Sequence, residues 1–224
     1  MVDPGAAHVK RRRSYDASRR RAAEAANRRR VLDVARELFL SEGYAATTVP
    51  RVAAGAGVSV KSVHRLARGK TGLVRALCQE ALLGEGAEPA EARSDRLADE
   101  GHSALELVRG WTELLAEVSP RISPLHLLVQ ASAASDPGMA GLVADLDDAR
   151  LARMTTNARR LLAADGVRRD MTLELAAEVL WLYTAPEWYE RLVLQRGWSV
   201  GAYAQFVGAA IAAALLEDRA GQPE

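Results

Sequence analysis

Residues 28–77 read RRRVLDVARELFLSEGYAATTVPRVAAGAGVSVKSVHRLARGKTGLVRAL, and this stretch decides the fold. Its first part carries apolar residues at three- and four-residue spacing, namely Val31, Val34, Ala35, Leu38 and Phe39. Polar residues such as Asp33 and Arg36 take the opposite side, a pattern typical of an amphipathic helix. Gly43 predicts the end of this helix, because glycine accepts the left-handed conformation in which helices often stop.

Two short helices with a tight turn between them are predicted next. Thr48 can cap the first, and Pro50 lies in its first turn, where the missing proline N–H costs no hydrogen bond. Glycines at 55 and 57 form the turn, and Ser59 offers a cap for a helix that starts at Val60. Such a pair is the geometry of a helix-turn-helix, in which one helix crosses the DNA backbone and the other enters the major groove.

Polar residues on and around the second short helix favour contact with DNA. Lys61 and Ser62, early in that helix, are expected to read base edges, with Val60 touching a thymine methyl. Thr48 and Arg51 lie near a helix N-terminus, whose free N–H groups favour a phosphate. The full set of predicted DNA contacts is Arg28, Arg29, Arg30, Thr47, Thr48, Arg51, Ser59, Val60, Lys61, Ser62, His64, Arg65 and Lys70.

The charges of the chain are unevenly distributed, although its formal net charge is only +1. Residues 1–75 contain 17 Lys and Arg against 6 Asp and Glu, and the remaining residues contain 13 against 23. A basic head on an acidic body suggests that the head alone meets a polyanion. We interpret residues 1–26 as a basic flexible arm whose second half becomes helical. Its arginines leave three roles open: contact with a minor groove, nonspecific attraction to phosphates, or none.

Composition and motifs exclude several classes of protein. With 49% hydrophobic and 26% charged residues, the 224-residue chain has ordinary globular usage. Cys78 is the only cysteine, so no intramolecular disulfide or cysteine-based zinc site can form. The start of the chain lacks an apolar run of signal-peptide length, and residues 200–216 are short for a membrane span. Because the chain has no Glu-x-x-His pair, P-loop or Gly-x-Ser-x-Gly motif, we expect a protein that is not an enzyme, with no catalytic residue, metal or cofactor. The missing signal-peptide run and the single cysteine lead us to expect a cytoplasmic protein.

After the head, the pattern is helical throughout. A helix starts near Lys70, a polar linker covers residues 85–94, and further helices are predicted at roughly 103–118, 124–135, 139–164, 172–195 and 200–218. Pro186 either kinks or restarts the fourth of these. We therefore predict an all-α protein, with a three-helix DNA-binding domain containing the helix-turn-helix at 27–72 and a larger helical domain at 73–224.

The quoted stretch resembles the DNA-binding domain of the TetR family of regulators over its whole length without a gap. The matching residues are Phe39, Gly43-Tyr44, Thr47-Thr48, Val52-Ala53, Gly57-Val58-Ser59, and Lys70 followed by Leu73. The resemblance implies that the larger domain binds a ligand and dimerises mainly through its last two long helices, and that a small molecule relieves repression. The twofold symmetry of such a homodimer implies a near-palindromic double-stranded operator, with recognition helices about 34 to 36 Å apart.

Three positions depart from the family pattern. His64 stands where the family usually has an aromatic residue, most often tyrosine, that touches a phosphate, and it can still donate to one. Ala67 replaces an aromatic residue that packs the recognition helix, which leaves either a looser helix or a space filled by Leu66 and Leu73. Pro50 occupies a place where some members present a base-reading side chain. These departures concern the strength and base preference of DNA binding and not the fold.

Apolar helix faces of the larger domain form either a pocket for a small-molecule effector of unknown identity or ordinary core. Gln130 and His126, four apart on one face, are the expected polar pair. The predicted pocket residues are Trp111, Leu115, His126, Gln130, Met154, Trp181 and Thr184. Small residues near the C-terminal end permit close packing between subunits in a four-helix interface. The predicted dimer residues are Trp188, Leu192, Gly201, Ala204, Gly208, Ala212 and Leu215.

Two functions remain in competition at this point. The first is a DNA-binding transcriptional regulator, expected to be a homodimeric repressor that a small molecule releases from its operator. The second is a helical small-molecule-binding protein or enzyme whose basic head is only a solubilising tail. Sequence-specific binding to upstream DNA that weakens steeply with salt distinguishes the first from the second.

Overall fold

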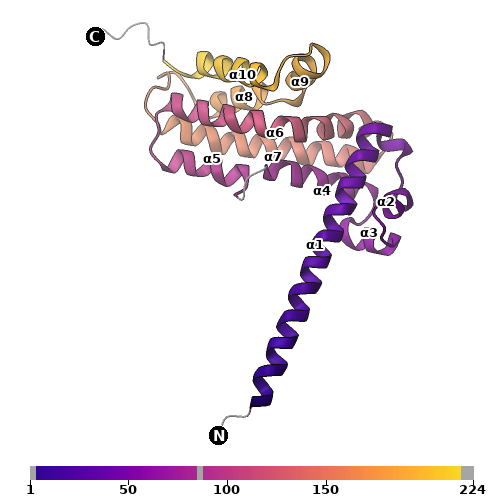
Figure 1. The fold of residues 1–224 in the computed structure, drawn as a ribbon. Coiled ribbons are helices and arrows are strands. Elements are labelled where there is room, and N and C mark those ends of the chain that lie inside the picture. The colour runs from indigo at the N-terminus through magenta and orange to yellow at the C-terminus, as the bar shows by residue number, and fades with distance from the viewer. Residues whose placement is uncertain (1–3, 85–87, 218–224) are drawn as a thin grey trace. The chain divides into compact units, whose positions relative to one another are not determined.

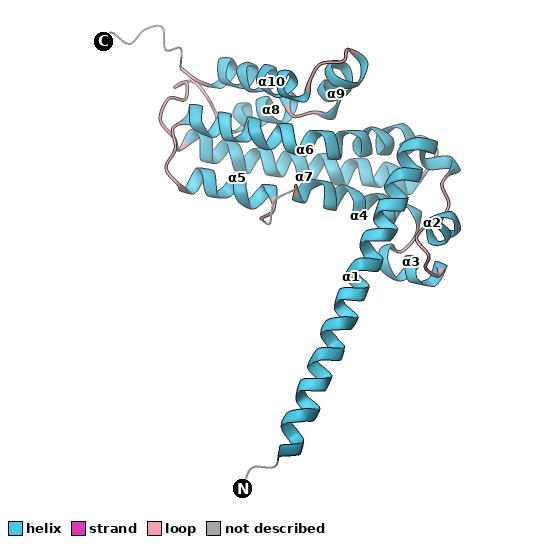
Figure 2. Ribbon diagram, viewed as in Figure 1, coloured by secondary structure: helices cyan, strands magenta, loops and turns pink. Residues whose placement is uncertain are grey.

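The computed structural model describes residues 4–84 and 88–217, and regular structure there is helical apart from one isolated antiparallel bridge between Val167 and Leu216 (Figure 2). This confirms the all-α prediction. The chain divides into two compact units, Met1–Ala76 and Leu77–Glu224, of which we call the second the body. The division falls inside helix α4 (Lys70–Leu83), whereas the sequence pattern placed it between residues 72 and 73. No helix in the described ranges is long and apolar enough to cross a membrane.

The first unit begins with α1 (Pro4–Ala46), the long indigo helix of Figure 1. We expected helix only in the second half of the N-terminal arm, but α1 starts at Pro4. Gly43 interrupts it with φ 83° and ψ 171°, so the predicted stop is present although helical residues follow up to Ala46. Glycine takes this positive φ without the clash that a Cβ atom would cause.

Two shorter helices follow, α2 (Val49–Gly55) and α3 (Val60–Ala67). Thr48 caps α2 by accepting a hydrogen bond from the Arg51 N–H at 3.4 Å. Ser59 caps α3 by accepting one from the Ser62 N–H at 3.1 Å, and Gly57, with φ 64°, turns the chain between the two helices. The structure therefore confirms the predicted helix-turn-helix. Its caps and turn could be predicted because they depend on residues that are adjacent in sequence.

A single core joins the helices of the first unit. Its largest buried members are Val31, Leu32, Phe39, Tyr44, Val52, Val63, Leu73 and Val74. Phe39 stacks on Tyr44 with ring centroids 5.9 Å apart, and the Tyr44 hydroxyl lies 3.0 Å from Thr71 Oγ1. Lys70 Nζ lies 3.9 Å from the centre of the same tyrosine ring. Tyr44 therefore fastens the end of α1 to the start of α4.

The start of α4 also lies very close to the end of α3. A Cβ atom at Gly72 would stand 1.4 Å from the carbonyl oxygen of Ala67, so no side chain fits there. Ala67 is itself buried, and Leu73 is fully buried. The small residues at positions 67 and 72 allow the end of α3 to approach the start of α4 closely. This close contact favours a tightly held α3 over a loosened one.

The body contains the rest of α4, six further α-helices in its described residues and one π-helical segment. Their bounds are α5 (Ala90–Asp99), α6 (Ala104–Ala133), α7 (Pro137–Leu162), α8 (Leu173–Tyr183), α9 (Pro186–Tyr189), η1 (Glu190–Gln195) and α10 (Val200–Leu215). Pro186 restarts a helix, one of the two outcomes expected for it. Two predictions are wrong, because α5 begins inside the expected linker and α6 runs unbroken through Pro120 and Pro124. A proline removes only its own N–H bond, and the helices that pack along α6 hold it in line.

Helix α6 is the central element of the body. It packs against α5, α7, α9 and α10, while α8 packs against α7 and α10. The core between these helices includes Leu107, Val108, Leu161, Leu180, Tyr203, Val207 and Leu215. A Cβ atom at Gly208 would lie 2.4 Å from Thr112 Oγ1, so α10 lies directly against α6 at this point.

Candidate functional site

One side of α3 is exposed and basic. Its exposed residues are Val60, Lys61, His64, Arg65 and, at the C-cap, Arg68. The other side holds the buried Val63 and Ala67. Because the exposed positions recur at one- and four-residue spacing, they share one face, and their donors can reach phosphates and base edges of a major groove. Arg68 was not among the predicted contacts, because it follows the last helical residue.

The neighbouring threonines and serines divide between core and surface. Thr47 is fully buried and donates its hydroxyl to the Gly43 carbonyl at 2.9 Å, so the prediction that it contacts DNA is wrong. A buried hydroxyl needs an acceptor inside the protein, and the interrupted end of α1 provides one. Ser62 is half-buried, with its hydroxyl 2.9 Å from that of Ser59. Thr48 and Ser59 are exposed while they cap their helices.

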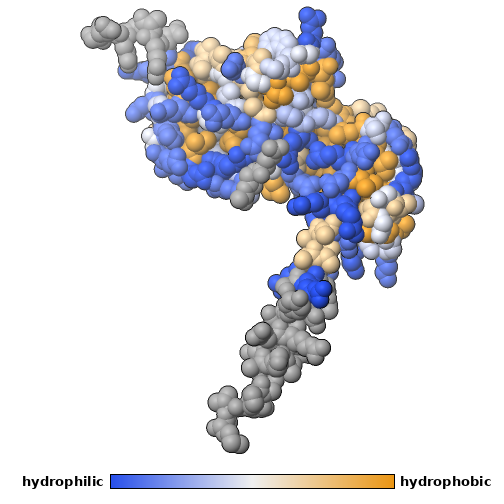
Figure 3. Space-filling model, in the orientation of Figure 1, coloured by the Kyte–Doolittle hydropathy of each residue, from blue (hydrophilic) through white to orange (hydrophobic). Residues whose placement is uncertain are grey.

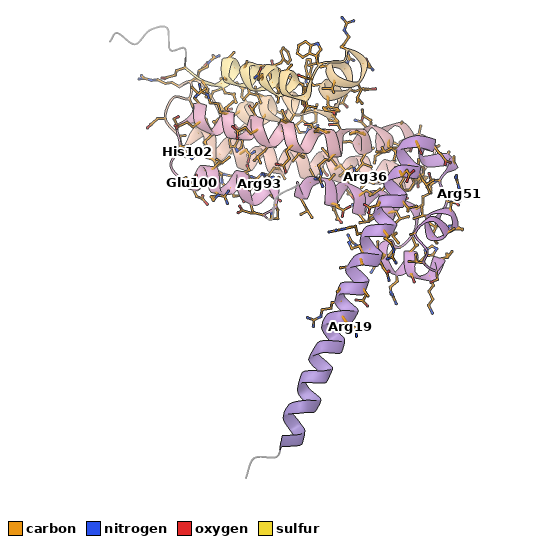
Figure 4. All side chains as sticks on the ribbon, viewed as in Figure 1. Arg19, Arg36, Arg51, Arg93, Glu100 and His102 are labelled. Carbon is orange, nitrogen blue, oxygen red and sulfur yellow. The ribbon has the colours of Figure 1, made fainter. Side chains whose placement is uncertain are left out.

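Arg51 and Lys70 form hydrogen bonds to residues near the end of α1. The Arg51 guanidinium, labelled in Figure 4, donates to both carboxylate oxygens of Glu42 at 2.5 and 2.8 Å. These hydrogen bonds raise the pKa of Arg51 and lower that of Glu42. Lys70 Nζ donates to the Ala45 carbonyl at 3.4 Å. A phosphate contact by either residue would have to share or replace these bonds.

Helix α1 presents basic side chains to solvent before it reaches the core. Residues 21–30 are all exposed, including the predicted contacts Arg28, Arg29 and Arg30. Arg30 donates to the Asn27 side-chain oxygen at 2.5 Å, and Arg19 is exposed on the same helix (Figure 4). The side chains of residues 1–18 and of Arg20, with the arginine cluster at 11–13, lie outside the described residues.

The body contains a cavity of about 380 Å³, within the size range of pockets for drug-sized molecules. Its apolar walls are formed mainly by Leu82, Val108, Trp111, Leu114, Leu115, Val118, Ile122, Leu146, Met154, Leu180, Val207 and Ile211. Its polar lining residues are Glu91, Ser94, Thr112, Ser119, Ser123, His126, Arg150, Arg153, Asn157 and Thr184. A mainly apolar wall with a few polar groups suits a small organic molecule.

The structure separates the predicted pocket residues into two groups. Those that line the cavity are Trp111, Leu115, His126, Met154 and Thr184. Gln130 does not line it, because its amide donates to the Glu187 carboxylate at 2.7 Å. Trp181 does not line it either, since its ring lies against the Arg150 guanidinium, 4.4 Å from the ring centroid. Helical spacing placed all of these residues on apolar faces, but could not tell which faces meet the cavity.

Arg150 is a charged cavity residue outside the predicted set. Its guanidinium is 16% exposed, donates to the Trp181 carbonyl and donates to Asp147 Oδ1 at 3.4 Å. His126 is 4% exposed, and its Nε2 lies 3.7 Å from the same aspartate oxygen. Burial lowers the pKa of both His126 and Arg150, and the Asp147 carboxylate acts in the opposite direction. The available sequence signal is the four-residue spacing of Arg150 and Met154 on α7, which places Arg150 on the same side of the helix as a predicted pocket residue.

The predicted dimer seam is largely internal to the chain. Its members buried inside the body are Ala204, Gly208 and Leu215, and those half-buried against the core are Trp188, Leu192 and Ala212. Of the predicted set only Gly201 is exposed. The prediction is therefore wrong for the three buried residues. Small residues at helical spacing show that a helix is closely approached, but not whether the approaching helix belongs to the same subunit.

Exposed apolar side chains occur on α8, on α10 and in the segment between them. Leu175, Leu182, Leu194, Trp198 and Phe206 are between 39% and 54% exposed, and we call them the C-terminal apolar surface. Phe206 contacts Trp188 and Trp198 with ring centroids 6.2 and 5.8 Å apart. Figure 3 shows apolar residues gathered over α9 and α10. Several large apolar side chains exposed together favour contact with a protein partner.

Comparisons with known proteins agree with this geometry. Residues 31–77 match the sequence profile of the bacterial regulatory proteins of the TetR family, and no curated protein sequence matches the chain. The solved complex of SmeT with triclosan has a TM-score of 0.69 at 17% identity, over 88% of this chain and 95% of SmeT. NalD, the secondary repressor of the MexAB-OprM multidrug efflux pump in Pseudomonas aeruginosa, has a TM-score of 0.64 at 18% identity, over 87% and 99%. A candidate TetR-family regulator from Rhodococcus sp. has a TM-score of 0.59 at 16% identity, over 85% and 99%.

The family match and the structural similarity cover different parts of the chain. The profile match spans the helix-turn-helix and ends at the start of the body, where α4 crosses the boundary between the units. The similarity in fold extends over both units, at identities that show the fold alone. Residues 31–77 are therefore similar to the bacterial regulatory proteins of the TetR family, and over both units the chain has the fold of solved proteins that include the repressor NalD.

Proposed function

We propose that the protein is a homodimeric repressor that binds a near-palindromic operator through α3 and leaves it when a small molecule occupies the body cavity. The observation that carries this proposal is the exposed face of α3, where Lys61, Arg65 and Arg68 present positive charge. The buried side chains of Val63 and Ala67 hold the helix from behind. The strong excess of basic residues in the first third of the chain supports attraction to DNA phosphates.

The cavity supports release by a small molecule. Its volume of about 380 Å³ and its mainly apolar lining suit an organic effector. Two proteins of the same fold support repression and small-molecule binding, since NalD is described as a repressor and SmeT has been solved with triclosan. An effector that binds the DNA-free form more tightly than the DNA-bound form shifts the protein off its operator.

The C-terminal apolar surface supports the homodimer. A twofold axis brings the same patch of two copies together, so large exposed residues such as Leu182 and Phe206 would be covered on both subunits at once. A dimer presents two α3 helices to DNA. Operator half-sites one helical turn apart would require these helices to lie about 34 to 36 Å from each other.

DNA binding can be tested with the full chain and its own upstream DNA. Fluorescence anisotropy recorded at rising salt should show specific binding that weakens steeply, because phosphate contacts release counterions. Lys61→Ala should cost about 1 to 3 kcal/mol of binding free energy on the upstream DNA and much less on unrelated DNA. Arg159→Ala, at an exposed arginine of α7, is the matched control and should change neither affinity.

Two results would contradict this proposal in different ways. Equal losses by Lys61→Ala on both DNAs would show that Lys61 touches only phosphate. Absence of any preference of the parent protein for the upstream DNA over unrelated DNA would exclude the operator and leave the alternative of a small-molecule-binding protein with a solubilising basic head.

A further inference from the structure

The body cavity follows one face of α6. Its lining residues along this helix include Val108, Trp111, Leu115, Ser119, Ile122 and His126, which recur at three- and four-residue spacing. From Val108 to His126 an α-helix rises about 27 Å. The cavity is therefore elongated, with Trp111 toward one end and His126 at the other.

The buried polar atoms of the body that have no hydrogen-bond partner share one chemistry. In the described part of the chain they are all nitrogens: Arg93 Nε, Trp111 Nε1, His126 Nε2, Arg150 Nε and Trp181 Nε1. Three of the five residues, Trp111, His126 and Arg150, line the cavity. Indole and guanidinium nitrogens can only donate, and an imidazole nitrogen can donate in the appropriate tautomer. The walls therefore match a ligand that offers hydrogen-bond acceptors.

Two of the residues that carry these nitrogens, His126 and Arg150, lie at the same end of the cavity. His126 Nε2 and Arg150 Nη2 lie 3.7 and 3.4 Å from the same oxygen of Asp147. The other lining arginine, Arg153, is better neutralised, because it donates to Asp95 at 2.7 Å and to Glu91 at 3.2 Å. Arg150 is thus the cavity cation whose charge is least offset by a close carboxylate.

The two carboxylates near this end are not among the residues that line the cavity. Asp147 and Glu187 do not line it, and Glu187 accepts a hydrogen bond from the Gln130 amide. Glu91 does line it, but its side chain is 71% exposed and is bound to Arg153. A cationic ligand would therefore meet the positive charge of Arg150, while the nearest carboxylate, that of Asp147, is already bound to Arg150 and does not line the cavity.

We propose that the effector is an elongated apolar molecule with a carboxylate at one end, and that this carboxylate binds Arg150 and His126. The proposal rests on the proposed function, in which an effector enters this cavity. A carboxylate has two oxygens, so one can accept from Arg150 Nε–H and the other from His126 Nε2–H, the two donors that the protein leaves unpaired. Its apolar part would extend along Ile122 and Leu115 toward Trp111.

The ligand class can be tested by calorimetry on the full chain with three molecules of equal length: decanoate, decan-1-ol and decylammonium. Decanoate should bind at least about tenfold more tightly than the other two, which corresponds to about 1.4 kcal/mol. Arg150→Met should lower the affinity for decanoate about tenfold and leave that for decan-1-ol unchanged, since the alcohol needs no cation. Arg159→Met, at an exposed arginine of the same helix, is the matched control and should bind all three as the parent does.

Binding of decan-1-ol by Arg150→Met reports that the cavity is still formed, so a misfolded variant is recognised by loss of both ligands. The comparison of the three ligands on the parent protein needs no variant. Decylammonium or decan-1-ol binding as tightly as decanoate would overturn the proposal, and so would failure of all three to bind. Release of upstream DNA is measured separately. Decanoate that binds with the expected preference but releases no DNA supports the ligand class and contradicts the proposed repressor mechanism.

Discussion

The first unit and the body differ in how closely their sequences predict their structures. In the first unit the caps at Thr48 and Ser59 and the turn at Gly57 stand where the residues indicate. In the body, α6 continues through Pro120 and Pro124, where the sequence predicted a break. Short helices are bounded by signals a few residues apart, whereas a long helix surrounded by packed neighbours is held by contacts that override a local break.

The same contrast applies to the surfaces that carry function. The exposed side of α3 follows from its own residues, because eight residues leave little choice of which side is apolar. In the body, α10 has small or apolar residues on most of its circumference, so its sequence is compatible with either side facing inward. Substitutions at close helix contacts and at exposed surfaces test this difference between the two units.

The largest effect is expected at Gly72 in the first unit. Gly72→Ala places a Cβ atom 1.4 Å from the Ala67 carbonyl oxygen, so α3 and α4 must separate. We expect a loss of about 3 kcal/mol or more in the free energy of unfolding, together with loss of specific DNA binding. Urea unfolding followed by circular dichroism measures the first and anisotropy the second.

Gly141→Ala is the matched control for this prediction. Gly141 lies inside α7, is exposed and has no atom within 4 Å of the added Cβ position. Alanine should stabilise the helix by about 0.5 to 1 kcal/mol, because glycine loses more backbone entropy on folding. Similar small changes for both variants would show that the approach of α3 and α4 is not as close as described.

The next largest effect concerns the outward side of α10. Phe206→Asp places a charge in the C-terminal apolar surface and should weaken self-association by about 2 kcal/mol. Loss of its ring contacts with Trp188 and Trp198 should also lower the free energy of unfolding of the subunit by about 1 kcal/mol. Leu151→Asp is the control, since Leu151 on α7 is exposed to nearly the same extent, 37% against 39%. Sedimentation velocity over a range of concentrations measures both, and equal behaviour of the two variants would place the subunit contact elsewhere.

A smaller effect should appear as pH dependence of the body. Burial lowers the pKa of His126 in the folded protein, opposed by Asp147 and Glu187 and reinforced by Arg150. Below about pH 6.5 the unfolded chain therefore takes up a proton at this residue before the folded protein does, and stability falls as pH falls. Urea unfolding between pH 7 and pH 5 should show a shallower decline for His126→Phe than for the parent. His64→Gln, at an exposed histidine of α3, should keep the steeper decline.

The smallest effect is expected at the C-cap of α3. Arg68 has φ 53° and ψ 34°, a left-handed conformation that is costly for residues with a Cβ atom. Arg68→Gly should stabilise the first unit by about 0.5 to 1 kcal/mol. Because Arg68 also lies on the exposed face of α3, the same variant should bind DNA more weakly despite its higher stability. Unchanged DNA affinity would remove Arg68 from the interface.

Local sequence patterns are sufficient to predict the all-α class, the helix-turn-helix, the interruption at Gly43 and the basic side of α3. Each of these depends on residues within about two helical turns, because caps, glycine turns and apolar periodicity act locally. The resemblance over residues 28–77 has the same origin, and the family profile matches nearly the same stretch.

Which side of each helix is covered depends on how the helices pack against one another. Tertiary packing turned Gly208 toward Thr112, directed Gln130 to Glu187 and brought Arg150 to the cavity. These outcomes depend on contacts between residues that are far apart in the sequence. A helical pattern states that a side is apolar or small, but the helix that packs there determines whether it becomes core, cavity or subunit surface.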